Sequence, residues 1–232
     1  MLKRLCLTLL LLPLPAFAAP ALWQTLDCGD AGVLSYSYQR QGKQLAITQG
    51  GQTTILPAQR NHGAPRYGNR NLQITLATTP VVVRQKQQQP CTRQNGPLWE
   101  NAEKGIRLQL PASWPMEQIK LGFVRDETAA LLAPGATAFT QFNWADTGGH
   151  PAVLARLVVY PRAAWEEQLS SNPELQAQWL GENGLYVWAL QQPANPGITP
   201  GSSNARRLDG MRQDMDQWRA AFSVSTTASD SD

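Results

Sequence analysis

Apolar and polar residues alternate along the first half of the chain, the pattern of strands that bury one face. Leu34, Tyr36 and Tyr38 alternate with serines, and Gly50-Gly51 lies between two further runs, as in a two-residue hairpin. Five to seven short antiparallel strands favour a small closed barrel or a sandwich, because these forms leave few unpaired edges. Strands are predicted at residues 34–38, 45–47, 53–56, 72–76 and 81–84.

The second half mixes strand and helix patterns. Ile106, Leu108 and Leu110 alternate before Pro111, and a helix is predicted from Pro161. Apolar residues recur every three or four positions over 205–222, which predicts a final amphipathic helix. The fold class is therefore mainly β followed by an α+β domain with an antiparallel sheet. Further strands are predicted at residues 119–125, 128–132, 137–142, 153–160 and 185–190.

The chain begins like a secretory signal peptide. Lys3 and Arg4 precede an apolar run that ends at the small residues Ala16-Phe17-Ala18. Cleavage near this site would leave a soluble periplasmic or secreted protein with no transmembrane segment. No cysteine follows the site, so a lipoprotein is not expected. The alternative is an N-terminal membrane anchor that is not cut.

Export would determine which cysteines can pair and whether they are oxidised. Removing the signal (residues 1–18) takes away Cys6 and leaves Cys28 and Cys91 in an oxidising compartment, where such a pair most often forms a disulfide. A zinc site is the alternative, but only His62 and His150 could complete it, and neither has ligand spacing. We expect no metal and no cofactor.

Opposite charges divide the chain. Residues 21–98 carry eight basic and two acidic side chains, whereas residues 99–232 carry ten basic and fifteen acidic ones. The basic half suits an acidic partner, although a solvated face of scattered charges is an equal alternative. The polar stretch 85–97 marks the boundary. We expect a β domain at 21–94, a linker at 95–104, an α+β domain at 105–223 and a disordered tail at 224–232.

A family resemblance covers about residues 24–93. The order is Cys28, an alternating strand, the motif GAPRY at 63–67, another alternating strand and Cys91. This order resembles the membrane-bound lysozyme inhibitor family, which inhibits c-type lysozyme. The resemblance implies a small disulfide-tied β-barrel, in which one loop enters the lysozyme cleft and a second loop supports it. Both loops present polar groups to the two catalytic carboxylates.

The family's first loop reads Ser-Gly-x-x-Tyr. In this chain His62 stands at the serine position and Pro65 looks like an inserted residue. The Lys-Gly pair of the second loop falls near Ala77-Thr78, where neither residue is kept. Arg66 is the group expected to pair with a carboxylate. The resemblance implies a partner-binding loop of His62, Gly63, Ala64, Arg66 and Tyr67.

Residues 105–223 are similar to the PsbP-like superfamily. The similarity consists of an opening GIRLQLPASW, a meander and a final amphipathic helix. It implies a scaffold that binds partners more often than one that does chemistry, and fold alone assigns no function. Trp114, Trp188 and Trp218 lie on apolar patterns and are expected in the core.

Catalytic alternatives have little support. His150 has Asp146 four residues before it, but no nucleophile motif accompanies the pair, and a loop histidine is the favoured interpretation. Glu166-Glu167 and the acidic residues at 209–216 are expected on solvated helix faces. No glycine-rich phosphate loop is present. We expect no catalytic residues and no enzyme activity.

These patterns lead to two functional hypotheses. The first is an exported binding protein that inhibits c-type lysozyme through the loop at 62–67. The second is an envelope adaptor or structural protein whose basic half binds an anionic polymer or another envelope protein. Nucleic acid is not an expected partner. A hydrolase remains only as a residual alternative, because it has no nameable site.

Overall fold

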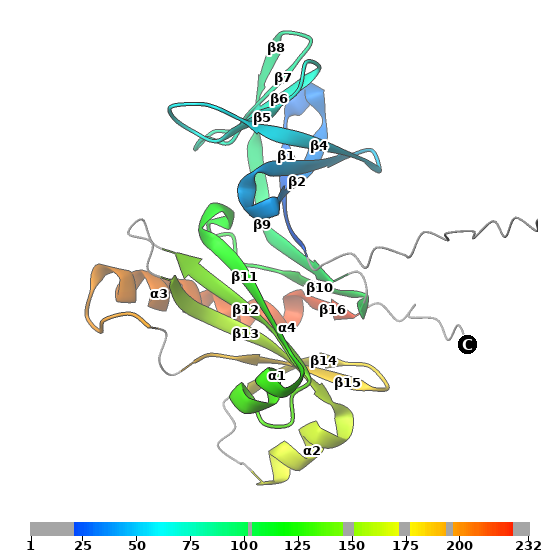
Figure 1. Ribbon diagram of the computed structural model, residues 1–232, viewed down its shortest axis with the longest axis vertical. Coiled ribbons are helices and arrows are strands. Elements are labelled where there is room, and N and C mark those ends of the chain that lie inside the picture. The colour runs from blue at the N-terminus through cyan, green and yellow to red at the C-terminus, as the bar shows by residue number, and fades with distance from the viewer. Residues whose placement is uncertain (1–20, 102–103, 146–150, 172–176, 194–196, 225–232) are drawn as a thin grey trace, which may run out of the picture.

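The computed structural model describes residues 21–101, 104–145, 151–171, 177–193 and 197–224 (Figure 1). Two antiparallel sheets make up most of it. The upper part in Figure 1 holds the first half of the chain, and the lower part holds the second sheet and the helices. The predicted signal peptide lies outside the described residues. Of the predicted tail, Val224 belongs to a strand and the remainder lies outside them.

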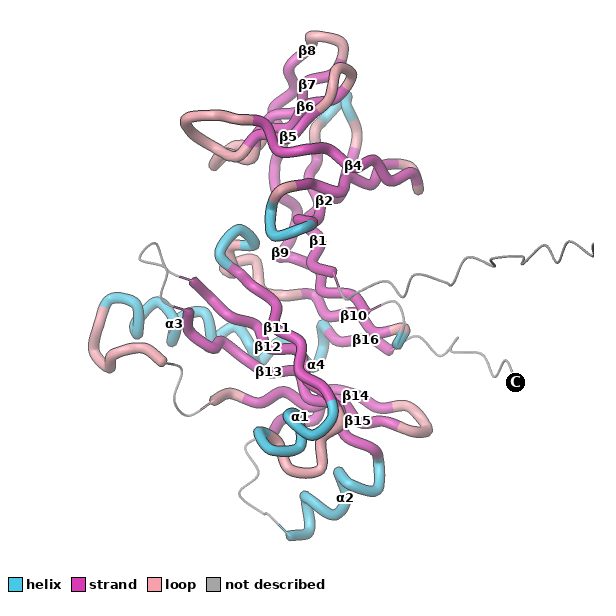
Figure 2. Tube along the Cα trace, in the orientation of Figure 1, coloured by secondary structure: helices cyan, strands magenta, loops and turns pink. Residues whose placement is uncertain are grey.

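Eight short strands fold in order in the first half, each antiparallel to the next (Figure 2). All five strands predicted there are confirmed. Gly50 and Gly51 both have positive φ, 55° and 79°, as the predicted hairpin requires. The strands are β1 Ala21–Asp27, β2 Val33–Gln39, β3 Gln44–Gln49, β4 Gln52–Gln59, β5 Arg66–Gly68, β6 Leu72–Thr75, β7 Val81–Arg84 and β8 Gln87–Pro90.

The predicted closed barrel is wrong. Strand β9 (Thr92–Asn101) pairs with the edge of β1 and then with β10 (Ile106–Gln109), which pairs with β16 (Phe222–Val224). This gives an open sheet in the order β16-β10-β9-β1-β2-β3-β4-β5-β6-β7-β8. The ladder does not close because β9 occupies the edge of β1 and carries the sheet into the second half.

Strand β9 contains a bulge in the segment for which a linker is predicted. Residues 95–101 belong to β9, and the register of its ladder with β1 shifts between Trp23 and Thr25. Asn95 has a φ of 53°, and the Gln24 side chain donates to the Gln94 carbonyl at 3.0 Å. Bulges bend a strand. The polar stretch therefore bends strand β9 at the point where the sheet passes from the first half of the chain to the second.

The second sheet has the order β11-β12-β13-β15-β14. Its strands confirm the predictions at 119–125, 137–142, 153–160 and 185–190, whereas the strand predicted at 128–132 is wrong. That segment is helix α1 (Asp126–Leu132), whose alanines and leucines are strong helix formers. The strands are β11 Ile119–Arg125, β12 Ala138–Ala145, β13 Pro151–Pro161, β14 Ala177–Glu182 and β15 Tyr186–Gln191.

The predicted final helix is interrupted. Helix α3 (Ser203–Gln213) passes into a 3-10 turn and then into helix α4 (Trp218–Ala221), and Phe222 begins β16. The predicted apolar stripe is confirmed up to Trp218. The helix predicted from Pro161 is α2 (Arg162–Ser171), with Pro161 as the last residue of β13. The short 3-10 turns are η1 Gly29–Ala31, η2 Arg40–Gly42, η4 Met116–Gln118 and η5 Asp214–Gln217.

One hydrophobic core runs through both halves. It extends from Leu26 and Tyr36 in the first sheet to the buried tryptophans of the second half. The rings of Trp114 and Trp218 lie 5.2 Å apart, and Phe142 lies 5.5 Å from Trp218. Trp114, Trp188 and Trp218 are all buried, as predicted. The first half is therefore packed directly against the second.

Candidate functional site

The predicted partner-binding loop joins β4 to β5. His62 and Gly63 are exposed and Ala64 is half-buried. Arg66, the first residue of β5, is exposed, and its Nε donates to the Thr75 hydroxyl at 3.3 Å. The Asn61 side chain donates to the Ala64 carbonyl at 3.0 Å and restrains the turn. The loop at 60–65 therefore presents polar groups from a β framework.

Tyr67 does not belong to that exposed surface. Its side chain is buried, its hydroxyl donates to the Gly42 carbonyl at 2.9 Å, and burial raises its pKa. Its ring lies 6.1 Å from the ring of Tyr38. Tyr67 therefore ties β5 to the turn η2 and is not placed to contact a partner.

The second predicted loop lies beside the first. Pro65, Ala77 and Thr78 line one hollow of about 570 Å³. The Arg93 guanidinium donates to the carbonyls of Thr78 at 2.8 Å and Ala77 at 3.0 Å. The structure thus brings the two loops together, and Arg93 holds the backbone of the second one.

Glu117 of η4 connects the second half to this site. Its carboxylate pairs with Arg93 at 3.0 Å and accepts a hydrogen bond from the Tyr36 hydroxyl at 3.4 Å. Both members of the ion pair are about one-third exposed, 30% and 34%, so solvent weakens their attraction. No local pattern marks Glu117 or Arg93 in the sequence, and reasoning from the sequence missed both.

A second hollow is also lined by Pro65 and Glu117. It measures about 530 Å³ and is lined by Tyr38, by Gln41 of η2 and by strand β11. Gln41 has a φ of 59°, a left-handed conformation that costs roughly 1–3 kcal/mol in a residue other than glycine. Pro65 and Glu117 line both hollows, so the junction of the two halves is indented at two places.

Alkaline pH should destabilise this junction. Burial raises the pKa of Tyr36 and of Tyr38, and the neighbouring Glu117 carboxylate raises that of Tyr36 further. An unfolded tyrosine ionises near its ordinary pKa of about 10, whereas these two stay neutral in the folded protein. Their contribution is complete below pH 10 and is lost as the pH rises, by roughly 1 kcal/mol per pH unit for each tyrosine.

Urea unfolding at pH 8, 10 and 11 would measure this effect. The double variant Tyr36→Phe/Tyr38→Phe should show a clearly smaller decrease in unfolding free energy above pH 10. The remaining decrease is expected from Tyr67 and Tyr160, because burial also raises the pKa of each. An equally steep decrease in the double variant would assign the alkaline sensitivity to other groups.

The basic residues of the first half are almost all unpaired. Among the described residues, ion pairs involve only Arg93 of the eight. Arg84 is half-buried and bonds to the Gln49 amide. The positive charge of this half therefore faces solvent with little internal compensation. The remaining six are exposed: Arg40, Lys43, Arg60, Arg66, Arg70 and Lys86.

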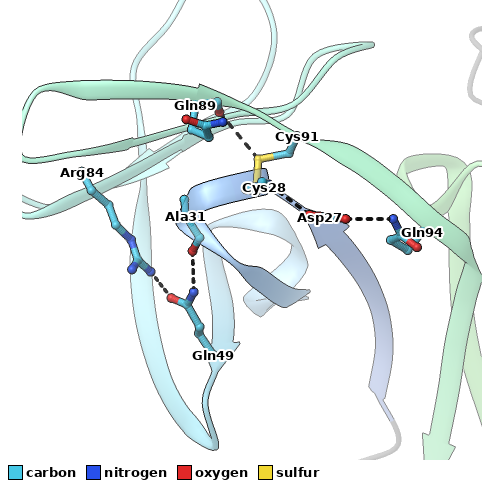
Figure 3. Close-up of a disulfide and its surroundings, with 9 residues drawn as sticks. Asp27, Cys28, Ala31, Gln49, Arg84, Gln89, Cys91 and Gln94 are labelled. Atoms are coloured by element: carbon cyan, nitrogen blue, oxygen red, sulfur yellow. Dashed lines mark hydrogen bonds between the residues drawn. A yellow bond between two sulfur atoms is a disulfide. The ribbon is translucent and has the colours of Figure 1, made fainter.

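The predicted disulfide is confirmed. Cys28 follows β1, Cys91 separates β8 from β9, and their Cα atoms lie 4.1 Å apart (Figure 3). Around it, the Gln94 side chain donates to Asp27 at 3.4 Å and the Gln49 amide donates to the Ala31 carbonyl at 2.8 Å. Asp27 pairs with Thr92 in the β1–β9 ladder, so the disulfide links the chain at the end of that ladder, where β8 passes into β9.

The catalytic alternatives gain nothing from the structure. His150 and Asp146 lie outside the described residues. Glu166 and Glu167 are exposed on α2, and Asp214 accepts a hydrogen bond from Ser113. Within the described ranges, no group of three His, Cys, Asp or Glu side chains could hold a metal ion.

Comparison with known proteins identifies no relative. No family model, no curated protein and no solved structure matches this chain. No described helix has the length and apolar character needed to cross a bilayer. What the protein does must therefore be inferred from its own residues.

Proposed function

We propose that this chain is an exported binding protein that inhibits c-type lysozyme. The loop at 60–65 would enter the lysozyme cleft, and Arg66 would pair with a catalytic carboxylate there. The supporting observation is the exposed guanidinium of Arg66 beside an exposed loop on a disulfide-tied β framework. Export is supported by the disulfide, which persists in oxidising compartments.

Arg60 supplies a second cation to the same loop. It directly follows β4, and the neighbouring Gln59 pairs with Arg66 across the β4–β5 ladder. Both arginines are exposed and make no ion pair with a described residue. Two guanidinium groups at the base of one loop suit two carboxylates in one cleft, since guanidinium groups bind carboxylates in a directed, charge-assisted manner.

Tyr67 has a supporting role in this proposal. Because its hydroxyl is bonded to the Gly42 carbonyl and its ring is buried, it fixes the strand that carries Arg66. Loss of Tyr67 would therefore change stability before it changed any contact with lysozyme. Arg66, and not Tyr67, is the residue that tests the proposed contact.

A turbidity assay of cell-wall lysis by c-type lysozyme tests the proposal. The full chain should inhibit at near-stoichiometric concentration, and Arg66→Ala should weaken inhibition at least tenfold. Arg70→Ala is a matched control, because Arg70 is also an exposed arginine but lies in the β5–β6 turn. Lysis that continues at large excess of folded, disulfide-bonded protein would overturn the proposal.

An envelope adaptor is the second candidate. The observation that favours it is the set of basic side chains without ion pairs in the first half, which suits an anionic polymer or an acidic partner. The same preparation can be mixed with poly-glutamate. Binding that is lost at high salt, together with absent lysozyme inhibition, would favour this candidate, because salt screens exposed charges.

A further inference from the structure

The second half has a partly open cavity that the proposed function does not use. It measures about 210 Å³ and lies between strands β9 and β10 of the first sheet and the face of the second sheet. Part of its lining is apolar and buried. The buried apolar residues that line it and belong to the main core are Trp99, Ile106, Leu157 and Val159.

The charged side chains that line this cavity, among the described residues, are cationic. Lys104 and Arg125 both line it, and no described carboxylate does. The Lys104 ammonium lies 5.3 Å from the centre of the Tyr186 ring. Lys104 is half-buried and Arg125 is exposed, and neither makes an ion pair with a described residue. Two cations therefore share the lining of a partly open pocket with buried apolar residues.

The lining also holds polar side chains. Asn101, Thr137 and Thr140 contribute an amide and two hydroxyl groups. With Lys104 and Arg125 they offer cations and hydrogen-bond donors, which is the complement of an anion that accepts hydrogen bonds.

The volume limits the size of the ligand. A dry cavity of about 150 Å³ holds a benzene molecule, so 210 Å³ admits one aromatic ring or a chain of about six carbons with a head group. The apolar body would lie against the buried walls. The head group would face Lys104 and Arg125.

We propose that this cavity binds a small amphipathic carboxylate, with one ring or a short acyl chain in the chamber and its carboxylate between Lys104 and Arg125. Neither cation belongs to the loop assigned to lysozyme. Binding here and inhibition there can therefore fail separately.

Calorimetric titration of the full chain with benzoate and with hexanoate tests the proposal. Both anions should bind, and their neutral counterparts benzyl alcohol and hexanol should bind at least tenfold more weakly. The double variant Lys104→Met/Arg125→Met should weaken binding of the anions at least tenfold. Lys120→Met is the matched control, because Lys120 is an exposed cation of β11 that does not line the cavity.

A second variant tests the location. Ala138 is half-buried and lines the cavity, so Ala138→Leu should fill it and abolish binding of both anions. Equal affinity for anions and neutral analogues would overturn the role of the cations. Undiminished binding to Ala138→Leu, or no binding of either anion to the folded full chain at millimolar concentration, would overturn the site itself.

Discussion

Replacement of Gly96 by alanine is expected to destabilise the protein by roughly 4 kcal/mol or more, the range reached only by the most disruptive substitutions. Gly96 is buried in the bulge of β9, where Leu110-Pro111 crosses it. An added Cβ would overlap the Leu110 carbonyl oxygen and lie 2.6 Å from that of Pro111. These are backbone atoms, so no side-chain rotation relieves the overlap.

The crossing itself must stay in place. The Leu110 N–H donates to the Pro97 carbonyl at 2.8 Å, and Leu110 is buried in the core. Moving the chain away from an alanine at position 96 would break that bond and displace Leu110. The loss of stability is therefore expected whether the alanine Cβ stays against the Leu110 carbonyl or the crossing chain moves away from it.

Urea unfolding followed by tryptophan fluorescence measures this cost. Gly63→Ala is the matched control, since a Cβ at Gly63 meets no atom within 4 Å and its stability should change little. A Gly96→Ala variant that unfolds within 1 kcal/mol of the parent would show that the crossing shifts without loss.

Removal of the disulfide should have the second large effect. Cys28 and Cys91 are separated by 63 positions, and the chain-entropy relation gives about 4 kcal/mol for a loop of that length. Cys91 directly precedes Thr92, which pairs with Asp27 in the β1–β9 ladder. The crosslink therefore lies at the end of an existing ladder, and the expected loss comes mainly from the freer unfolded chain. For a protein of this size the loss corresponds to a decrease in Tm of roughly 8–16 °C.

Thermal unfolding of Cys28→Ala/Cys91→Ala measures this loss, and the parent protein under reducing conditions is its control. The two should unfold at similar temperatures, because both lack the same crosslink. A double variant that unfolds within 2 °C of the oxidised parent would show that strand pairing alone holds the two ends together.

Local patterns predicted most of the strands. The segments predicted as strands at 34–38, 72–76 and 119–125 all correspond to strands. In a strand every second residue faces the core, so a few neighbouring residues are enough to show the pattern. The segment 128–132 was predicted wrongly because four apolar residues in five suit a short strand or a helix equally well. The buried contacts of Ala129 and Ala133 show that the segment packs as a helix.

Only some residues of the candidate site could be predicted from the sequence. Exposed Arg66 and its loop follow from polar residues between two strands, whereas the buried position of Tyr67 depends on Gly42, which lies 25 residues earlier. The ion pair between Arg93 and Glu117 joins residues 24 positions apart, and the Tyr36–Glu117 hydrogen bond spans 81 positions. A pattern among neighbouring residues cannot predict contacts between residues so far apart in the sequence.

By itself, the sequence determined ten of the strands, the disulfide partners and the charge opposition between the halves. Each of these is a property of residue types and of local spacing. Strands β1, β5, β8, β9, β14 and β16 were not predicted. The tertiary structure alone decided that β9 takes the edge of β1, that the predicted linker becomes a bulge, and that Lys104 and Arg125 meet at one cavity. These outcomes depend on which distant surfaces bury each other, because a strand edge pairs with whichever neighbour the shared core brings beside it.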